Sequence, residues 1–365
     1  MDLAGLPWFP PVRVVRAVET VRSGLIKLTQ LIAPSPVNVL ELATGSWVTQ
    51  AVYTATKLGI PDALAGGPLT AEEVAEKVGA NSDGTQRLLR ALAAKSVFRE
   101  GSDGRFELTA MGQSLRSDAA DSVRPLVLMI GHPAHWEHWG GLLYSVQTGK
   151  SSLEQIRGLS AFDYFEEDEE VAQVFNDAMT VTSEMVIGPV LAAYDFKKYR
   201  TVVDVGGGHG RLLAAILQQS PRSRGVLFEL PTVLPGAWDL FVDAGVADRA
   251  EAVGGSFFES VPADGDAYVL KNIVHDWPEE QAIEILRNVR AAMRDDGRVL
   301  LIEAVIPEGN GEHVSKWLNL EMLIQTGGRE RTVGQYSELL EHAGLRLNRV
   351  VPTIGPASLI EAIAR

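Results

Sequence analysis

The chain has 365 residues, of which 46% are hydrophobic, with 33 Lys and Arg against 47 Asp and Glu and no cysteine. This length suits two domains with sizeable cores. The net charge of −14 argues against a nucleic-acid partner, and the lack of cysteine excludes disulfides, thiolate catalysis and zinc–thiolate sites. We find neither the roughly 20 apolar residues of a membrane span nor a secretory signal. We therefore expect a cytoplasmic protein without a membrane partner.

The N-terminal part of the chain is predicted to be helical. Residues 1–36 should form a partly helical extension that ends at prolines. Residues 37–115 should form a separate domain, whose first segment, 37–64, is helical and apolar with breaks at Gly59 and Pro61. This segment has more apolar surface than a small module needs, so we expect it to lie in a homodimer interface.

Residues 70–108 have the element order of a winged helix. Thr70 and Glu73 predict a capping box at the start of one helix, and Gly79 predicts its end. A second helix and a hairpin near 97–108 follow. Winged helices can bind DNA, but acidic residues cancel the few basic ones here. We therefore expect this domain to serve dimerisation.

The remainder of the chain is predicted to be a helical bridging segment, 116–200, followed by an α/β domain, 201–365. Strands are expected at 201–205, 225–229, 250–253, 267–271 and 298–304. Two further strands near 346–351 and 358–364 are close in sequence and should pair antiparallel. The others, linked by helices, should be parallel. The fold class is thus a Rossmann-like, mostly parallel sheet with an antiparallel last strand, preceded by a mainly helical domain.

The most informative run covers residues 202–211, Val-Val-Asp-Val-Gly-Gly-Gly-His-Gly-Arg. Strand, glycine turn and helix start are the elements that hold nucleoside cofactors in open α/β sheets. The dinucleotide pattern G-x-G-x-x-G fails, because its last position falls on Arg211 or Leu213. The turn instead favours a cofactor that has an amino-acid moiety and no pyrophosphate, namely S-adenosylmethionine. Glu229 ends the next strand, where a carboxylate can bind a ribose diol.

His275 follows the fourth strand of the sheet, and Pro278 is predicted to open the next helix at its first position. Ligands bind along this carboxyl edge of open α/β sheets. Because histidine titrates near neutral pH, His275 is a candidate general base.

Two carboxylates are expected near His275. Glu303 ends the fifth strand, and Glu330 lies in a loop before a helix that Thr332 and Gln335 cap. A carboxylate bound to one ring nitrogen fixes the histidine tautomer and raises the basicity of the other nitrogen. A separate histidine cluster at 132–138 matches no catalytic zinc motif, so no metal is predicted.

These motifs resemble the S-adenosylmethionine-dependent small-molecule O-methyltransferases that have an N-terminal winged-helix dimerisation domain, such as plant caffeate and flavonoid enzymes and bacterial polyketide-tailoring enzymes. The resemblance covers about residues 37–365 and rests on the motifs at 204–210, 271–277 and 327–332. It implies His275 as the base, flanked by Glu303 and Glu330. The cofactor-binding residues expected on these grounds are Asp204, Gly206, Gly208, Gly210, Glu229, Leu230, Gly255, Ser256, Phe257, Lys271 and Ser183. The expected substrate-binding residues are His132, Trp136, Phe162, Phe175, Met179, Asp276 and Met322.

Three positions depart from the family's usual pattern. The family usually has Asp where Glu229 stands, and an acid where Asn319 stands. It usually has Gly-Asp before the residue that packs on adenine, whereas this chain has Gly255-Ser256. The histidine and its two acids are intact.

The predicted reaction is methyl transfer, without a metal, to a phenolic hydroxyl of an aromatic or polyketide-like small molecule. Transfer to nitrogen, and a non-methylating decarboxylase or hydroxylase relative, are alternatives on the same fold. The His-Glu-Glu set favours oxygen, because a nitrogen nucleophile needs no strong base. An alternative of another class is a ligand-responsive regulator that uses the winged helix to bind DNA.

Overall fold

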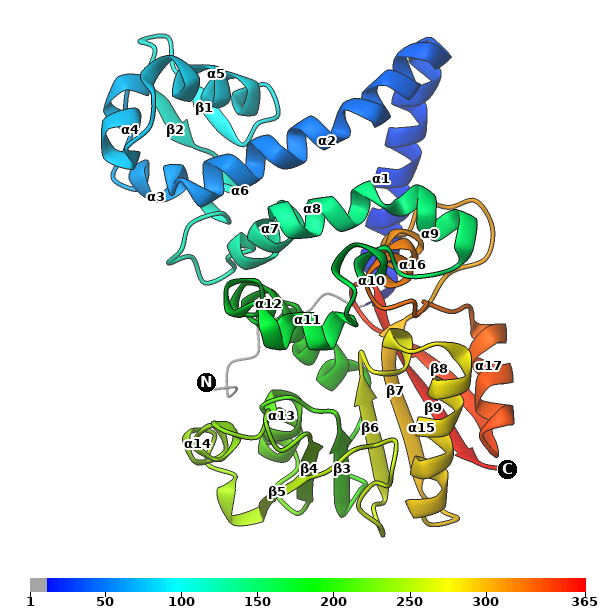
Figure 1. Cartoon of the computed structure of the whole chain (residues 1–365). Helices are drawn as coiled ribbons and strands as arrows, with labels where there is room; N and C mark the ends of the chain where they lie inside the picture. The colour runs from blue at the N-terminus through cyan, green and yellow to red at the C-terminus, as the bar shows by residue number, and fades with distance from the viewer. Residues whose placement is uncertain (1–11) are drawn as a thin grey trace. The chain divides into compact units, whose positions relative to one another are not determined.

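The computed structural model describes residues 12–365, which divide into two compact units (Figure 1). One unit consists of Leu25–Gly140 and Phe162–Thr182. The other consists of the described residues up to Gly24, with Gly141–Ala161 and Ser183–Arg365. The domain limits at 36, 115 and 200 stay predictions, and residues 1–11 of the predicted extension lie outside the described residues.

The predicted N-terminal helices are present, but their limits differ from the prediction. Pro34 is the N-cap of the second helix and Pro36 lies in its first turn, so the preceding helix ends at Ile32 and not at the prolines. Proline fits the first turn of a helix because the N–H groups there have no partner within the helix. Gly59, with φ 75°, causes the predicted break. These helices are α1 (Val12–Ile32), α2 (Ser35–Lys57) and α3 (Ile60–Ala63).

The winged helix is confirmed. The Glu73 amide donates to Thr70 Oγ1 at 3.2 Å and the Thr70 amide donates to Glu73 Oε2 at 2.8 Å, which makes the predicted capping box. Apolar side chains from the helices and the hairpin share one core that includes Leu89, Phe98 and Phe106. The elements are α4 (Ala71–Val78), α5 (Ser82–Ala93), β1 (Phe98–Glu100) and β2 (Phe106–Leu108).

Residues 116–200 are largely helical, as predicted. Their longest helix has 25 residues and contains Pro189. None of the helices within residues 12–365 is both long and apolar enough to cross a membrane. The helices between the hairpin and the sheet are α6 (Ala110–Gln113), α7 (Arg124–Ile130), α8 (Pro133–Gly140), α9 (Leu142–Thr148), α10 (Ser152–Arg157), α11 (Ala161–Glu167) and α12 (Glu169–Ala193).

The C-terminal part of the chain forms a seven-stranded sheet in the order β5-β4-β3-β6-β7-β9-β8. The first five of these strands pair parallel. β9 pairs antiparallel with both of its neighbours, which confirms the predicted fold class. The strands are β3 (Thr201–Val205), β4 (Arg224–Glu229), β5 (Ala250–Gly254), β6 (Ala267–Lys271), β7 (Arg298–Ala304), β8 (Leu345–Pro352) and β9 (Ala357–Ala364).

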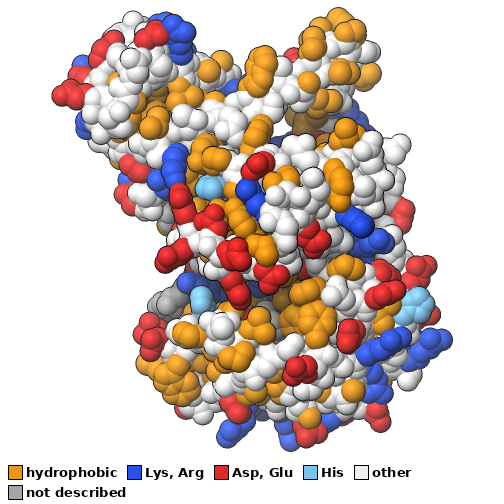
Figure 2. Space-filling model, viewed as in Figure 1, with side chains coloured by type: hydrophobic (Ala, Val, Ile, Leu, Met, Phe, Trp, Pro, Cys, Tyr) orange, Lys and Arg blue, Asp and Glu red, His pale blue; other side chains and the backbone are white. Residues whose placement is uncertain are grey.

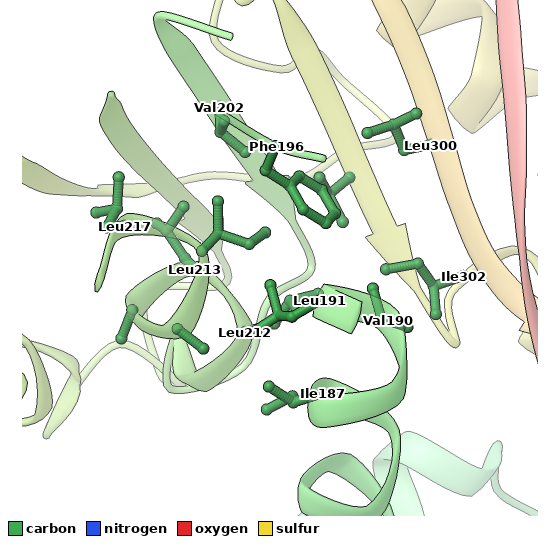
Figure 3. Close-up of a cluster of buried hydrophobic side chains, with 14 of the residues drawn as sticks. Ile187, Val190, Leu191, Phe196, Val202, Leu212, Leu213, Leu217, Leu300 and Ile302 are labelled. Atoms are coloured by element: carbon green, nitrogen blue, oxygen red, sulfur yellow. The ribbon is translucent and has the colours of Figure 1, made fainter. Parts of the chain in front are cut away.

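Helices cover both faces of this sheet. Because successive side chains point to opposite faces of a strand, Val202 joins the core with α12 and α13, whereas Val203 joins the core with α15 and α17. Figure 3 shows the first core, to which α12 contributes Leu191, α13 contributes Leu213 and the sheet contributes Val202. The remaining helices are α13 (Arg211–Gln219), α14 (Ala237–Asp243), η2 (Ala247–Arg249), η3 (Val274–Asp276), α15 (Glu279–Ala292), α16 (Val314–Gln325) and α17 (Val333–His342).

Candidate active site

The glycine turn follows β3 and requires left-handed backbone at three positions. Gly206, Gly208 and Gly210 have φ values of 66°, 58° and 81°. A Cβ at Gly206 would lie 2.6 Å from Ile273 Cδ1, whereas a Cβ at Gly208 would meet nothing within 4 Å. The turn therefore presents bare main chain to open space at Gly208, as a cofactor site requires.

Glu229 is bound to this turn. Its Oε2 accepts from the Gly208 amide at 2.9 Å, and its Oε1 accepts from the Leu230 amide at 2.7 Å. A carboxylate has about four acceptor positions, so each oxygen can still accept one hydroxyl group. This arrangement suits a ribose diol.

Asp204 is buried beneath the turn, with 1% of its surface exposed. Neither carboxylate oxygen has a hydrogen bond of good geometry among the described residues, although the Leu213 backbone amide acts to lower its pKa. Burial raises the pKa of Asp204 to about 7, although the positive charge of Lys271 opposes the rise. A buried acceptor without a donor is costly, so Asp204 fits a ligand that brings a donor, such as an ammonium group.

Lys271 ends β6 between the turn and His275. Its Nζ donates to Ser183 Oγ at 3.0 Å, which connects it to α12. Burial lowers the pKa of Lys271, whereas the negative charges of Asp204, Glu303 and Asp276 oppose that effect. Lys271 thus interacts with acids of both the glycine turn and the histidine cluster.

The expected adenine side of the site follows β5. The Gly255 amide donates to the Glu229 carbonyl at 3.0 Å, and a Cβ on Gly255 would lie 2.7 Å from the Phe228 ring. Ser256 Oγ accepts from the Phe258 amide at 3.3 Å, so this hydroxyl already has a local contact. The Phe257 ring packs against Trp277 with centroids 6.0 Å apart.

His275 lies in η3 and contacts three carboxylates. Its Nδ1 is 2.8 Å from Glu330 Oε1 and 3.6 Å from Glu303 Oε2, and its Nε2 is 3.5 Å from Asp276 Oδ1. An ionised carboxylate only accepts, so the short contact places a proton on Nδ1. In the neutral imidazole, Nε2 is then the proton acceptor. Pro278 is the N-cap of α15 and not its first residue as predicted.

The carboxylates set the protonation of His275. Burial alone would lower the pKa of His275, but the negative charges of Glu303, Asp276 and Glu330 raise it to about 10. Burial raises the pKa of Glu303 to about 7, and the cationic imidazole opposes that rise. The acids therefore make His275 more basic than a free histidine.

Both glutamates are held by groups outside the imidazole. Glu303 Oε1 accepts from the Ile273 and Val274 amides at 3.1 and 2.9 Å. The Glu330 amide donates to Asn319 Oδ1 at 2.9 Å. His275, Glu303 and Glu330 each offer one nitrogen or oxygen atom that could bind a metal ion, and these atoms lie within 4.8 Å of one another.

The expected substrate-binding residues fall on both units. Phe175 stacks on Phe165 with centroids 4.3 Å apart, and Trp136 and Phe162 are exposed. The members on the unit that holds the winged helix are His132, Trp136, Phe162, Phe175 and Met179. Asp276 and Met322 belong to the other unit.

Sequence reasoning missed two residues that hold the histidine loop. A Cβ on Gly328 would overlap the carbonyl oxygen of His275 and lie 2.7 Å from the carbonyl carbon of Asp276. Arg331 is buried, and its Nη1 donates to the Val274 carbonyl at 3.3 Å. Their only signal in the sequence is their place in the run 327–332, which also contains Glu330.

Two family models match the chain. The O-methyltransferase domain matches residues 139–346, and the O-methyltransferase dimerisation domain matches residues 40–118. The first match includes every residue of the glycine turn and of the histidine cluster. The second includes the whole winged helix.

Individual proteins are also similar to the chain. Phenazine O-methyltransferase PhzM of Lysobacter antibioticus is 42% identical over 344 residues, 94% of this chain and 98% of that protein. Phenazine-1-carboxylate N-methyltransferase of Pseudomonas aeruginosa is 31% identical over 314 residues, 86% and 93% of the two chains. The crystal structure of CalO1, a methyltransferase in calicheamicin biosynthesis in its S-adenosylhomocysteine-bound form, matches with a TM-score of 0.81 and 36% identity, over 91% of this chain and 98% of that one.

These matches agree with the glycine turn, the histidine cluster and the winged helix. The family model of the O-methyltransferase domain covers more than half of the chain. The chain therefore belongs to the S-adenosylmethionine-dependent O-methyltransferases that carry an N-terminal dimerisation domain.

Proposed function

We propose that this methyltransferase acts on a phenolic hydroxyl of an aromatic or polyketide-like small molecule, with His275 as general base and without a metal. The observation that supports this most is the 2.8 Å contact between His275 Nδ1 and Glu330. A phenol must lose a proton as it attacks, and a base of raised pKa assists that loss. The acceptors named for PhzM and the other relative are phenazines, which are planar and aromatic.

The residues divide the work of the reaction. S-adenosylmethionine supplies an electrophilic methyl group on a sulfonium. The acceptor oxygen gives its proton to Nε2 of His275 as the new carbon–oxygen bond forms and the carbon–sulfur bond breaks. The resulting imidazolium is stabilised by Glu330 and Glu303 at Nδ1. In-line placement of the reacting atoms supplies much of the rate enhancement.

Transfer to nitrogen is the main alternative, because a relative is named as an N-methyltransferase. An amine attacks with its own lone pair and needs no deprotonation beforehand. The two buried acids around His275 would then serve no purpose in the reaction. Membership of this enzyme family argues against the ligand-responsive regulator. A decarboxylase or hydroxylase relative stays an alternative.

A transfer assay tests the proposal. Purified protein is incubated with methyl-labelled S-adenosylmethionine, a chelator, and matched planar phenols and arylamines of two and three rings. We expect label on phenolic oxygen, at a rate that the chelator leaves unchanged, because His275 does the work of a metal. Activity that needs added divalent ion would assign the His275, Glu303 and Glu330 cluster to a metal instead.

We propose that Glu229 binds the cofactor ribose and that the other cofactor residues surround it. Glu229→Gln should weaken cofactor binding by about 1.5 to 3 kcal/mol, the usual cost of losing a hydrogen bond to a charged group. Isothermal titration with S-adenosylhomocysteine measures this loss. Asp239→Asn, a change of an acid in α14 outside the expected site, is the control. Unchanged affinity in Glu229→Gln would remove Glu229 from the ribose site.

The acceptor pocket is proposed to be lined by aromatic and methionine side chains. Phe165 of α11 stacks on Phe175 of α12, and Met179 lies one turn further along α12. His132 is half-buried, and its Nδ1 accepts from the Ala134 amide at 3.3 Å. Such a lining suits a flat polycyclic acceptor.

We propose that the protein is a homodimer that buries the apolar face of α1 and α2. Apolar residues recur along α1 at positions 14, 18, 21, 25, 28 and 32, each at least 50% exposed. This alternation of four and three residues is the spacing of a coiled-coil seam. Exposed apolar side chains continue onto α2 at Leu40, Leu42 and Trp47, and Figure 2 shows apolar side chains where the two helices adjoin. The dimerisation-domain match, residues 40–118, includes most of α2 and none of α1.

The double variant Leu25→Glu and Leu28→Glu should convert the dimer to a monomer, because it buries charge in an apolar seam. Sedimentation velocity measures the change. Lys27→Glu alters charge on the same exposed helix outside the seam and should stay dimeric. A double variant that remains dimeric would place the interface elsewhere.

A further inference from the structure

Arg331 is the largest of the fully buried side chains among the described residues, with 1% of its surface exposed. Burying a guanidinium is costly unless its donors are paired. The groups to which the Arg331 guanidinium donates hydrogen bonds therefore indicate the role of this residue.

Those contacts join three separate segments. Nη1 donates to the carbonyls of Val274 and Arg329 at 3.3 and 3.2 Å. Nη2 pairs with Glu279 Oε2 at 3.3 Å. One guanidinium thus connects the residue before His275, the residue before Glu330 and the first residue of α15.

Val274, the residue before His275, is held at both its amide and its carbonyl. The Val274 amide donates to Glu303 Oε1 at 2.9 Å, while its carbonyl accepts from Arg331. On the other side of the histidine, the His275 carbonyl accepts from the Arg329 amide at 2.8 Å. The histidine turn and the loop with Glu330 are therefore bonded to each other on both sides of the imidazole.

We propose that Arg331 is a positioning residue that sets the approach of His275 Nδ1 to Glu330 by fixing the Val274 and Arg329 carbonyls. The proposal rests on the proposed function, in which His275 is the base. Among the described residues, no hydrogen bond or ion pair joins Arg331 to the imidazole or to the expected cofactor residues. It acts on the reaction through the backbone of the two loops.

Loss of this guanidinium has two expected consequences. A misplacement of about 1 Å in a reacting group can lower turnover about 10²-fold. The charged groups that face His275 are Glu303 from β7, Glu330 from its loop and Asp276 from η3. A shifted loop would move the Glu330 carboxylate away from His275 Nδ1. Because that carboxylate helps to raise the pKa of His275, the pKa should then fall toward its ordinary value.

The test compares Arg331→Met, Arg331→Lys and the control Arg249→Met. Arg249 also donates to backbone carbonyls, those of Leu217, Ser220 and Ser223, but lies on η2 away from His275. The measured quantities are kcat, acceptor KM, cofactor Kd and the pH dependence of kcat/KM, each per folded protein. We expect Arg331→Met to lower kcat about 10²-fold with unchanged cofactor Kd, the order that misplacement of a catalytic group produces. The acid limb of kcat/KM should move to lower pH, and Arg331→Lys should lie between this variant and the native protein.

Other results overturn the proposal. Arg331→Met could lose activity only in proportion to its loss of folded protein, while the acid limb of its kcat/KM profile stays in place as in Arg249→Met. This result would assign Arg331 a structural role only. If Arg331→Met does not fold, the test rests on Arg331→Lys. A native kcat and a native acid limb of kcat/KM in Arg331→Lys would then refute the proposal. If His275→Ala keeps its turnover, the proposed base fails. If His275→Ala loses turnover while Arg331→Met keeps it, only the positioning role fails.

Discussion

Replacing His275 with alanine is expected to lower turnover by about 10² to 10⁴, the range that general-base catalysis contributes. Nε2 of His275 is the proposed proton acceptor, and Glu330 and Glu303 lie at its other ring nitrogen. Steady-state kinetics measures the loss, and titration with S-adenosylhomocysteine should show native affinity. Turnover that survives the substitution would remove His275 from the mechanism.

The pH dependence of the native protein provides a second view of the same residue. Glu303, Asp276 and Glu330 raise the pKa of His275 to about 10 against the lowering effect of burial. The base acts in its neutral form, whose fraction increases with pH and reaches one half at that pKa. We therefore expect kcat/KM to rise from neutral into alkaline pH. In His275→Ala this rise should disappear.

Gly328→Ala is expected to abolish most turnover by displacing the catalytic histidine. The added methyl group would overlap the His275 carbonyl oxygen and lie 2.7 Å from the Asp276 carbonyl carbon. Both of these atoms are backbone, so the loop must move. Overpacking of this kind costs about 1 to 3 kcal/mol of stability, and a shift of about 1 Å in the base can cost 10²-fold in rate. Thermal unfolding and kcat per folded protein measure the two effects.

Gly327→Ala is the matched control for this prediction. Gly327 has φ 74°, and a Cβ there would meet nothing within 4 Å. Alanine should therefore cost about 1 to 2 kcal/mol in backbone strain without pushing on the histidine. Equal losses of kcat in the two variants would show that strain in the loop, and not displacement of His275, is responsible.

Much of the sheet could be predicted because its strands have local signals. The apolar runs at 201–205, 267–271 and 298–304 match β3, β6 and β7 residue for residue. The capping residues Thr332 and Gln335 also match the start of α17. Hydrophobic periodicity and capping are properties of neighbouring residues, so one sequence reveals them.

The cluster of His275, Glu303 and Glu330 could be predicted for a different reason. Parallel strands end at one edge of a sheet, so His275 after β6 and Glu303 at the end of β7 meet although they are far apart in sequence. Glu330 lies in the loop between α16 and α17 and was predicted from the motif at 327–332. The contacts of Asp204 and Glu229 were harder to predict from the sequence. The bond from the Gly208 amide to Glu229 depends on the left-handed turn, which sequence spacing does not describe.

Arg331 and Gly328 could not be identified in advance, because their roles depend on the close approach of two loops. Nothing local distinguishes a buried arginine from the exposed Arg329 two residues earlier. Asn272 is similar, since its φ of 54° after β6 has no sequence signal such as glycine. Arg331 and Gly328 both lie against backbone carbonyl groups of the histidine turn, and every residue has such a group.

Oxygen methylation by a histidine base is tested most directly by methyl transfer to a matched pair of acceptors, a planar phenol and the amine of the same ring system. Native protein and His275→Ala are compared with both under single-turnover conditions. We predict faster transfer to the phenol by the native protein, and a much larger loss for the phenol than for the amine in His275→Ala. Faster transfer to the amine, unaffected by His275→Ala, would contradict oxygen methylation by a histidine base.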